Sequence, residues 1–171
     1  MEESGYYFGF PHRSEAYLNS QQESFLVLEK MKNPDMEFFN MSDISPKQPF
    51  MNYLEENNLE FSENNLSQII FESLPVLMEN KRFHNRPRPT QVNDNITPVQ
   101  SQTAATPSYP AGHTFQSYLI AHHLSIKHPK HRDEFFQIAK RIADARVSVG
   151  LHYPSDNEGG IALANRYLNL C

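Results

Sequence analysis

The sequence predicts an all-α fold, and two observations about the spacing of apolar residues support this prediction. Apolar side chains recur every three or four residues over several segments, which is the period of an amphipathic helix. No segment shows the alternation of apolar and polar residues that is typical of a half-buried strand. Because the chain has 171 residues and no internal repeat, we expect a single domain over residues 1–171.

Three helices are expected before residue 81, and their role is unassigned. They cover residues 14–32, about 49–57, and 62–80. In the third, an apolar stripe is formed by Leu66, Ile69, Ile70, Leu74 and Leu77. Pro75 lies within this stripe and predicts a kink or a break, because proline lacks the backbone N–H that continues a helix.

Residues 83–112 are expected to form one long connection. The segment is rich in Asn, Gln, Thr and Ser and contains five prolines, namely Pro87, Pro89, Pro98, Pro107 and Pro110. Loops of this length are uncommon in compact domains, and they are usually functional or disordered. Both ends of this segment carry unusual residues, which favours a loop pinned at an active site over a floppy insertion.

The helical pattern resumes after Gly112 and continues to the end of the chain. One helix ends at His128-Pro129, a second covers about 131–149, and a third begins near Ser155, where a capping box is predicted over residues 155–158. The inner face of the third helix would carry Asp156, Gly160, Ala164 and Tyr167. Arg146 lies on the apolar stripe of the second helix. A guanidinium that points into a core is costly unless an anion meets it.

The composition excludes several classes of function. The net charge of −5 argues against binding to nucleic acid or to an anionic membrane. The single cysteine, Cys171, rules out an intramolecular disulfide. We find neither a signal peptide nor an apolar run of about 20 residues that would span a membrane. The expected location is therefore the cytoplasm, with the protein in soluble form.

Three short segments combine basic residues with histidine and aspartate at fixed spacings. The first runs from Lys81 to Pro89, with Arg88 seven residues after Lys81. The second is Tyr109-Pro110-Ala111-Gly112-His113, and the third spaces Arg146, His152 and Asp156 by six and four residues. A phosphate dianion needs several converging donors, and the planar fork of arginine can bond two of its oxygens.

Taken in this order, the three segments resemble the signature of the type 2 phosphatidic acid phosphatase (PAP2) superfamily. Within that family the chain looks most like the soluble bacterial class A nonspecific acid phosphatases. The resemblance covers residues 81–156, whereas residues 1–80 match no pattern that we can name. It implies a single-domain helical bundle of the acid phosphatase and vanadium haloperoxidase type.

The resemblance also implies a role for each matching residue. The phosphate would be bound by Lys81, Arg88, Ala111, Gly112, His113 and Arg146. His152 would attack phosphorus and form a phosphohistidine, while Asp156 would hold the other ring nitrogen. His113 would protonate the leaving oxygen and then activate water. No metal is implied, because lysine and arginine supply the positive charge.

Some residues depart from the family pattern or receive no role. The family usually has serine where this chain has Ala111, so one hydroxyl donor is missing; a hydrogen bond to a charged group contributes about 1.5–3 kcal/mol. Ala145 replaces another frequent serine. Arg86 is interpreted as a solvated loop residue. A metal site formed by His122, His123, His128 and His131 is disfavoured, because these residues lack a supporting pattern around them.

The predicted function is metal-independent hydrolysis of soluble phosphate monoesters or anhydrides through a phosphohistidine. Two alternatives stay open: a vanadate-dependent haloperoxidase, and a phosphate-ligand binding protein with weakened catalysis. The first is disfavoured because the haloperoxidases of the family are much longer chains, and lipid phosphatase activity is disfavoured because no membrane helices accompany the motifs. We expect a small phosphorylated substrate and no cofactor, although vanadate or phosphate can occupy the site. A homodimer is compatible with the sequence.

Overall fold

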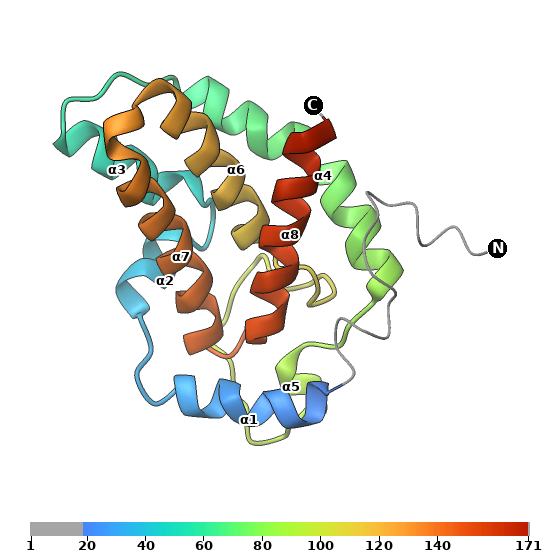
Figure 1. Ribbon diagram of the computed structural model, residues 1–171. Coiled ribbons are helices and arrows are strands. Elements are labelled where there is room, and N and C mark those ends of the chain that lie inside the picture. Colours follow the sequence, from blue (N-terminus) through green and yellow to red (C-terminus); the bar gives the residue numbers. More distant parts are fainter. Residues whose placement is uncertain (1–18, 171) are drawn as a thin grey trace.

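The computed structural model describes residues 19–170, and the regular elements of this part of the chain are all helical (Figure 1). The predicted fold class is therefore confirmed. In chain order the helices are α1 (Ser20–Lys30), α2 (Met36–Ser42), α3 (Lys47–Glu56), α4 (Glu63–His84), α5 (Pro89–Val92), α6 (Gly112–Lys127), α7 (Arg132–Ser148) and α8 (Pro154–Leu170). A 3-10 turn, η2 (Pro129–His131), joins α6 to α7.

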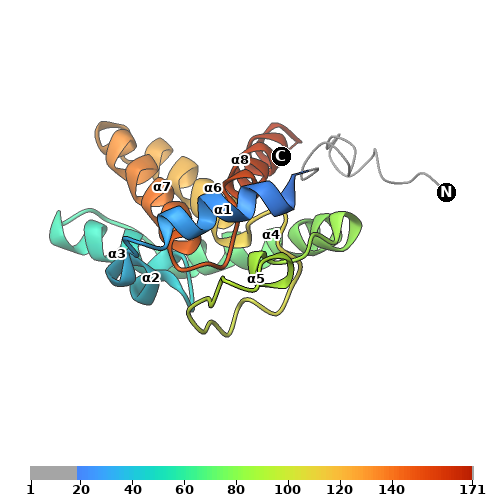
Figure 2. The ribbon, with the colours of Figure 1, turned by 90° about the horizontal axis from the view of Figure 1, so that it is seen from below.

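Helix α6 lies between α7 and α8 and packs against both of them (Figure 1). Figure 2 shows that these three helices form one layer, with α2 to α5 on the other side. Helix α6 is buried on most of its circumference, and buried apolar residues such as Phe115, Ile120 and Leu124 pack against different helices. A helix of this kind is expected at the centre of a helical domain.

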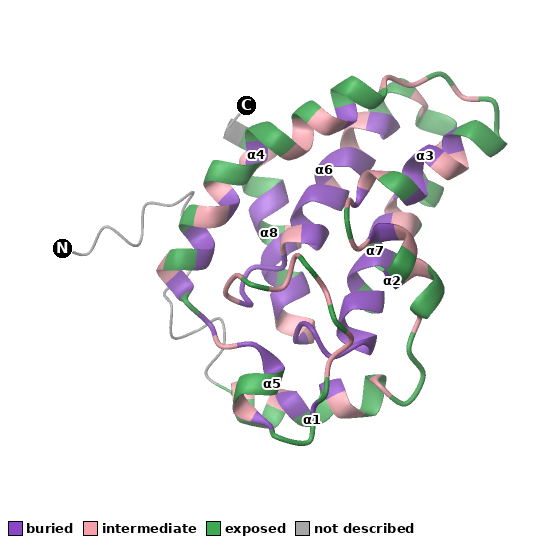
Figure 3. Ribbon diagram, turned by 180° about the vertical axis from the view of Figure 1, so that it is seen from behind, coloured by how far each residue is buried: buried purple, intermediate pink, exposed green. Residues whose placement is uncertain are grey.

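Two apolar clusters hold the helices around α6. The larger cluster joins α3, α4, α6 and α7 and includes Phe50, Leu54, Leu66, Ile120, Phe135 and Ile142. The second joins α4, α6 and α8 through Leu77, Phe115 and Leu163. In Figure 3 the buried residues lie on the faces that these helices turn toward one another. The clusters fix the helix ends at which the three sequence motifs lie.

Helix α4 differs from the prediction at two points. It runs unbroken through Pro75, and it ends at His84 instead of residue 80. Pro75 removes the hydrogen bond to the carbonyl of Phe71, but the side chain of Phe71 is 76% exposed, so this side of the helix faces water. Asn85 ends the helix with a left-handed conformation (φ 47°). As a result, Lys81 belongs to the last turn of α4 and not to a loop.

Other boundaries also differ from the expected ones. The first helix begins at Ser20, while residues 14–18 of the predicted 14–32 helix, like Cys171, lie outside the described residues. Helix α2 was not predicted; its N-terminus is capped by the side chain of Asp35, which accepts a hydrogen bond from the backbone N–H of Phe38. The long connection contains the short helix α5 and several buried residues, including Ile96 and Ser108. Within residues 19–170, no helix is both long enough and apolar enough to cross a membrane.

Candidate active site

The structure brings the basic, histidine and aspartate residues of the three motifs together at one end of the bundle. Each comes from the end of a helix or from the segment next to it, and each is buried: Lys81, Arg88, His113, Arg146, His152 and Asp156. A cavity of about 200 Å³ is lined by five of these side chains, Asp156 excepted, and by Gly112. A Cβ atom on Gly112 would lie 2.9 Å from Leu77 Cδ2, so this position favours glycine. Ala111 is fully buried beside it and does not line the cavity.

His152 is oriented by Asp156, four residues later in the chain. The Nδ1 atom of His152 lies 2.9 Å from Oδ2 of Asp156. Because the carboxylate can only accept, Nδ1 carries the ring proton of neutral His152, and Nε2 is left with a free electron pair. Burial would raise the pKa of Asp156, but the hydrogen bond from His152, the charge of Arg86 and the hydrogen bond from Ser108 lower it to about 2. Asp156 is therefore a carboxylate at neutral pH.

The start of α8 differs from the predicted capping box over residues 155–158. The helix begins at Pro154, and the backbone N–H of Tyr153 donates to Oδ2 of Asp156 over 3.0 Å. Asp156 therefore closes the first turn as the third residue of the helix, whereas Ser155 binds Glu23 of α1. The inner face of α8 is as predicted, with Asp156, Gly160 and Ala164 buried and Tyr167 half-buried.

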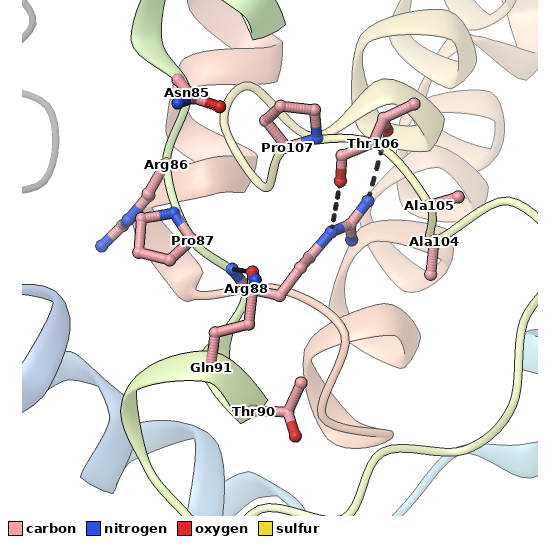
Figure 4. Close-up of a pocket in the computed structure, with 10 residues that line it drawn as sticks. All are labelled: Asn85, Arg86, Pro87, Arg88, Thr90, Gln91, Ala104, Ala105, Thr106 and Pro107. Atoms are coloured by element: carbon pink, nitrogen blue, oxygen red, sulfur yellow. Dashed lines mark hydrogen bonds between the residues drawn. The ribbon is translucent and has the colours of Figure 1, made fainter.

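Arg88 touches both the nucleophile candidate and the long loop. Its Nη1 atom lies 3.0 Å from Nε2 of His152 and donates to the carbonyl of Leu151 over 2.9 Å. Its Nε atom donates to the carbonyl of Thr106 (Figure 4). On the other side of Arg88 lies a hollow of about 480 Å³, lined by residues 85–88 and 104–107 among others, but by neither candidate histidine. Burial lowers the pKa of Arg88 to about 10, so the guanidinium remains charged at neutral pH.

Arg146 pairs with Asp43, a residue that the sequence analysis did not single out. Its Nη1 atom lies 2.9 Å from Oδ1 of Asp43, at the end of α2, and its Nη2 atom donates to Thr103 Oγ1. The charge that points into the core is thus balanced, as the position of Arg146 on an apolar stripe required. Lys81 donates instead to the carbonyl of Pro107 over 2.7 Å. Burial, and secondly the charge of Arg88, lower the pKa of Lys81 well below its usual range.

His113 lies in the first turn of α6 and faces the same cavity. Its Nε2 atom is 2.8 Å from the carbonyl oxygen of Asp43, so Nε2 carries the proton of the neutral ring and Nδ1 does not. Burial and the charge of Arg146 lower the pKa of His113 to about 3. Burial, followed by the charge of Arg88, likewise holds the pKa of His152 well below its usual value. Both imidazoles are therefore neutral near pH 7.

The interpretation of Arg86 as a solvated loop residue is wrong, because its side chain is buried. It is 1% exposed and is among the largest fully buried side chains of the described residues. Its Nη1 atom lies 2.8 Å from Oδ1 of Asp156, and its guanidinium lies over the ring of Tyr153, 3.7 Å from the centroid. A basic residue beside a proline is typical of a solvated loop. Arg86 is buried because its partners come from α1, α8 and the segment before α8, which are distant in the sequence.

Among residues 19–170, no histidine other than His113 and His152 lines this cavity. His128 contacts the carbonyl of Glu60, and His131 contacts the hydroxyl of Tyr53. Across residues 19–170, no three His, Cys, Asp or Glu side chains are grouped so that they could hold a metal ion.

The sequence model of a protein family described as the PAP2 superfamily matches residues 65–171. The match begins in α4, includes all three motifs and α8, and leaves α1 to α3 outside. No curated protein is significantly similar to the chain.

Proposed function

The chain belongs to the PAP2 superfamily, and from this premise we propose that it is a metal-independent phosphatase that forms a phosphohistidine. Phosphatase-type activity follows from the family. We propose more narrowly that the substrates are small, soluble phosphate monoesters or anhydrides. The observation that carries the proposal is the free electron pair on Nε2 of His152, which lies beside Arg88 and in one cavity with Lys81 and Arg146.

The first half of the proposed reaction transfers the phosphoryl group to His152. Lys81, Arg88 and Arg146 bind the nonbridging oxygens, and Arg88 exchanges its hydrogen bond to Nε2 for one to phosphate. Nε2 then attacks phosphorus in line, and the bond from phosphorus to the leaving oxygen breaks. The substrate enters as its monoanion, and the unprotonated Nδ1 of neutral His113 takes the substrate proton and gives it to the leaving oxygen. Nδ1 of His152 keeps its own proton, and the ring becomes a cation paired with Asp156.

The second half returns the site to its starting state. His113 removes a proton from a water molecule as the water oxygen bonds to phosphorus. The bond between phosphorus and Nε2 breaks and its electron pair returns to His152. His113 passes the proton taken from water to the phosphate, which leaves as its monoanion, so both imidazoles are neutral again. The cationic side chains stabilise the charge on the transferring group throughout, which is the role that Mg²⁺ has in many other phosphoryl transfer enzymes.

The test is hydrolysis of 4-nitrophenyl phosphate by the full chain in the presence of a chelator. We expect turnover that the chelator does not remove, that vanadate inhibits competitively, and that disappears in His152→Ala but not in the control His122→Ala. Loss of activity with chelator and its return with Mg²⁺ or Zn²⁺ would overturn the mechanism. Tight phosphate binding without turnover would identify a binding protein instead.

A further inference from the structure

Four side chains form a row from α1 to the candidate nucleophile, and the first three of them alternate in charge. Glu23 Oε2 lies 2.9 Å from Arg86 Nη2, Arg86 Nη1 lies 2.8 Å from Asp156 Oδ1, and Asp156 Oδ2 lies 2.9 Å from His152 Nδ1. Arg86, Asp156 and His152 are almost completely buried, and the side chain of Glu23 is 15% exposed. Because of this burial, solvent screens the ion pairs between these side chains poorly. We call the four residues the charge row.

The charge row is fixed in position at its outer end as well as at its inner end. Glu23 accepts hydrogen bonds from the backbone N–H and the hydroxyl of Ser155, both over 2.6 Å. The hydroxyl of Ser155 also accepts from Nη1 of Arg86. Asp156 is held on both carboxylate oxygens, because Arg86 binds Oδ1 while Ser108 and His152 bind Oδ2. Rotation of this carboxylate would break several of these bonds.

The charges in the row determine how well Asp156 can stabilise a cation on His152. In the phosphohistidine the imidazole carries a positive charge that Asp156 must balance. The positive charge of Arg86 offsets the negative charge of the same carboxylate, and the carboxylate of Glu23 in turn neutralises Arg86. Glu23, Arg86 and Asp156 together therefore carry one negative charge. Without the charge of Glu23, these three positions would carry none. The imidazolium would then form less easily and would lose its phosphoryl group more easily.

We propose that Glu23 and Arg86 are positioning residues that orient Asp156 and set its effective charge, and thereby balance formation of the phosphohistidine against its hydrolysis. This inference rests on the proposed function. It also gives a role to α1, which lies outside the part of the chain that matches the family. Glu23 lies in the first turn of α1 and reaches the start of α8 through Ser155.

The test compares Glu23→Gln with Glu29→Gln in the full chain. Glu29 is on the same helix, but its side chain is 67% exposed and pairs only with Lys32 among the described residues. Rapid-quench measurements with 4-nitrophenyl phosphate give the rate constants for formation and decay of the phosphoenzyme. In Glu23→Gln we expect formation to slow about tenfold, which corresponds to about 1.4 kcal/mol, and decay to accelerate. Glu29→Gln should match the unmodified protein.

A second variant separates charge from packing. Glu23→Asp keeps the carboxylate but is shorter, whereas Glu23→Gln keeps the shape and loses the charge. If charge matters, the aspartate variant forms the phosphoenzyme faster than the glutamine variant. The proposal would be overturned if the glutamine variant formed the phosphoenzyme faster than the aspartate variant. It would also be overturned if Glu23→Gln lowered both rate constants equally or changed neither.

A readout that needs no activity keeps this inference distinct from the proposed function. In the proton NMR spectrum, the Nδ1 proton of His152 should appear at low field because it is bonded to Asp156. In Glu23→Gln this resonance should move upfield, since Arg86 then draws more strongly on the carboxylate. If the unmodified protein forms no phosphohistidine, the proposed mechanism fails while this shift still tests the charge row. An unchanged resonance would overturn the role of Glu23.

Discussion

The guanidinium of Arg88 covers the proposed nucleophilic atom of His152, with Nη1 of the arginine 3.0 Å from Nε2 of the imidazole. Because Nδ1 of His152 donates to Asp156, Nε2 is the acceptor in this contact. The guanidinium that is proposed to bind phosphate therefore covers the proposed nucleophile. Binding of a phosphate oxygen by Arg88 would expose Nε2 in the same movement, which couples substrate binding to activation of the nucleophile.

The first prediction concerns the pH dependence of kcat/KM for a phosphate monoester. The pKa of His113 is lowered to about 3, and burial holds the pKa of His152 well below its usual value, so neither imidazole titrates in the ordinary range of histidine. The proton for the leaving group must then arrive with the substrate monoanion, whose second pKa is about 6. We expect kcat/KM to be level between about pH 4 and pH 6 and to fall tenfold per pH unit above that range.

The measurement is a pH series of initial rates at low substrate concentration. For a substrate whose second pKa is lower, the pH above which kcat/KM falls should be lower by the difference between the two substrate pKa values. A decrease on acidification with a midpoint near 6.5 would contradict the prediction, because it would show that a histidine of the free protein titrates in its ordinary range.

The second prediction concerns Ala111→Ser. Ala111 is the N-cap residue of α6 and provides no side-chain cap, and its backbone N–H donates to the carbonyl of Asp156. A serine hydroxyl can cap the helix, which stabilises a protein by about 1 kcal/mol, or donate to the phosphate. We expect the dissociation constant for phosphate to fall by up to about tenfold, which corresponds to about 1.4 kcal/mol.

Calorimetric titration with phosphate and thermal unfolding separate these two effects. A higher unfolding temperature with unchanged phosphate affinity would show that the hydroxyl caps α6 and that Ala111 is not a deficit in the site. Ala105→Ser, at an exposed position of the long loop, is the control and should change neither quantity.

The helices and the cavity residues were predictable to a large extent because their signals are local. The period of three to four residues locates the long helices. The spacing of Arg146, His152 and Asp156 places Arg146 at the end of α7, His152 in the connection and Asp156 at the start of α8. The position of Arg146 on an apolar stripe also required an anionic partner. Such signals are contained within one or two helical turns, so a single sequence is sufficient to detect them.

The residues that were missed depend on contacts between distant segments. Asp43 lies 103 residues before Arg146, and nothing in its own neighbourhood distinguishes it from other aspartates. Arg86 looks like a loop residue until Glu23 and Asp156 are placed around it. The course of α4 through Pro75 is likewise decided by packing, since the clusters around Leu66 and Leu77 hold the helix on both sides of the proline.

The third prediction concerns Asp43→Asn. In the unmodified protein the carboxylate of Asp43 neutralises Arg146 and lies where it would repel a phosphate dianion. Its removal should increase the affinity for phosphate and vanadate severalfold, while the free energy of unfolding falls. Breaking a buried ion pair costs about 3–5 kcal/mol, and the amide oxygen of asparagine should retain part of the hydrogen bonding.

The stability difference for Asp43→Asn should depend on pH. Burial opposes ionisation of Asp43, but Ser101 and Arg146 still lower its pKa below the usual value of 3.8. This ion pair therefore stabilises the fold above that pH, and the contribution is lost as the pH falls through the lowered pKa. Denaturation at pH 7 and pH 3, with and without phosphate, measures the difference in free energy of unfolding between Asp43→Asn and the unmodified protein. The control is Glu37→Gln, because Glu37 is exposed. Weaker phosphate binding by Asp43→Asn would contradict the prediction.

The last prediction separates the two histidines by the leaving group of the substrate. His152→Ala removes the nucleophile, so neither an aryl nor an alkyl phosphate should form a phosphoenzyme. His113 is needed only where a proton must be given to the leaving oxygen or taken from water. A nitrophenolate leaves without much protonation, whereas an alkoxide requires it. His113→Ala should therefore lose far more activity toward the alkyl ester than in forming the phosphoenzyme from the aryl ester.

The geometry explains why this separation should be clean. His113 binds the carbonyl of Asp43 at the start of α6, whereas His152 is held by Asp156 at the start of α8, so neither histidine orients the other. Burst kinetics with 4-nitrophenyl phosphate should show in His113→Ala a burst followed by slow turnover, because water is then poorly activated and the phosphohistidine accumulates. Mass spectrometry of the quenched protein should detect this intermediate on His152. A burst in His152→Ala, or equal losses for both esters in His113→Ala, would show that the two roles are assigned wrongly.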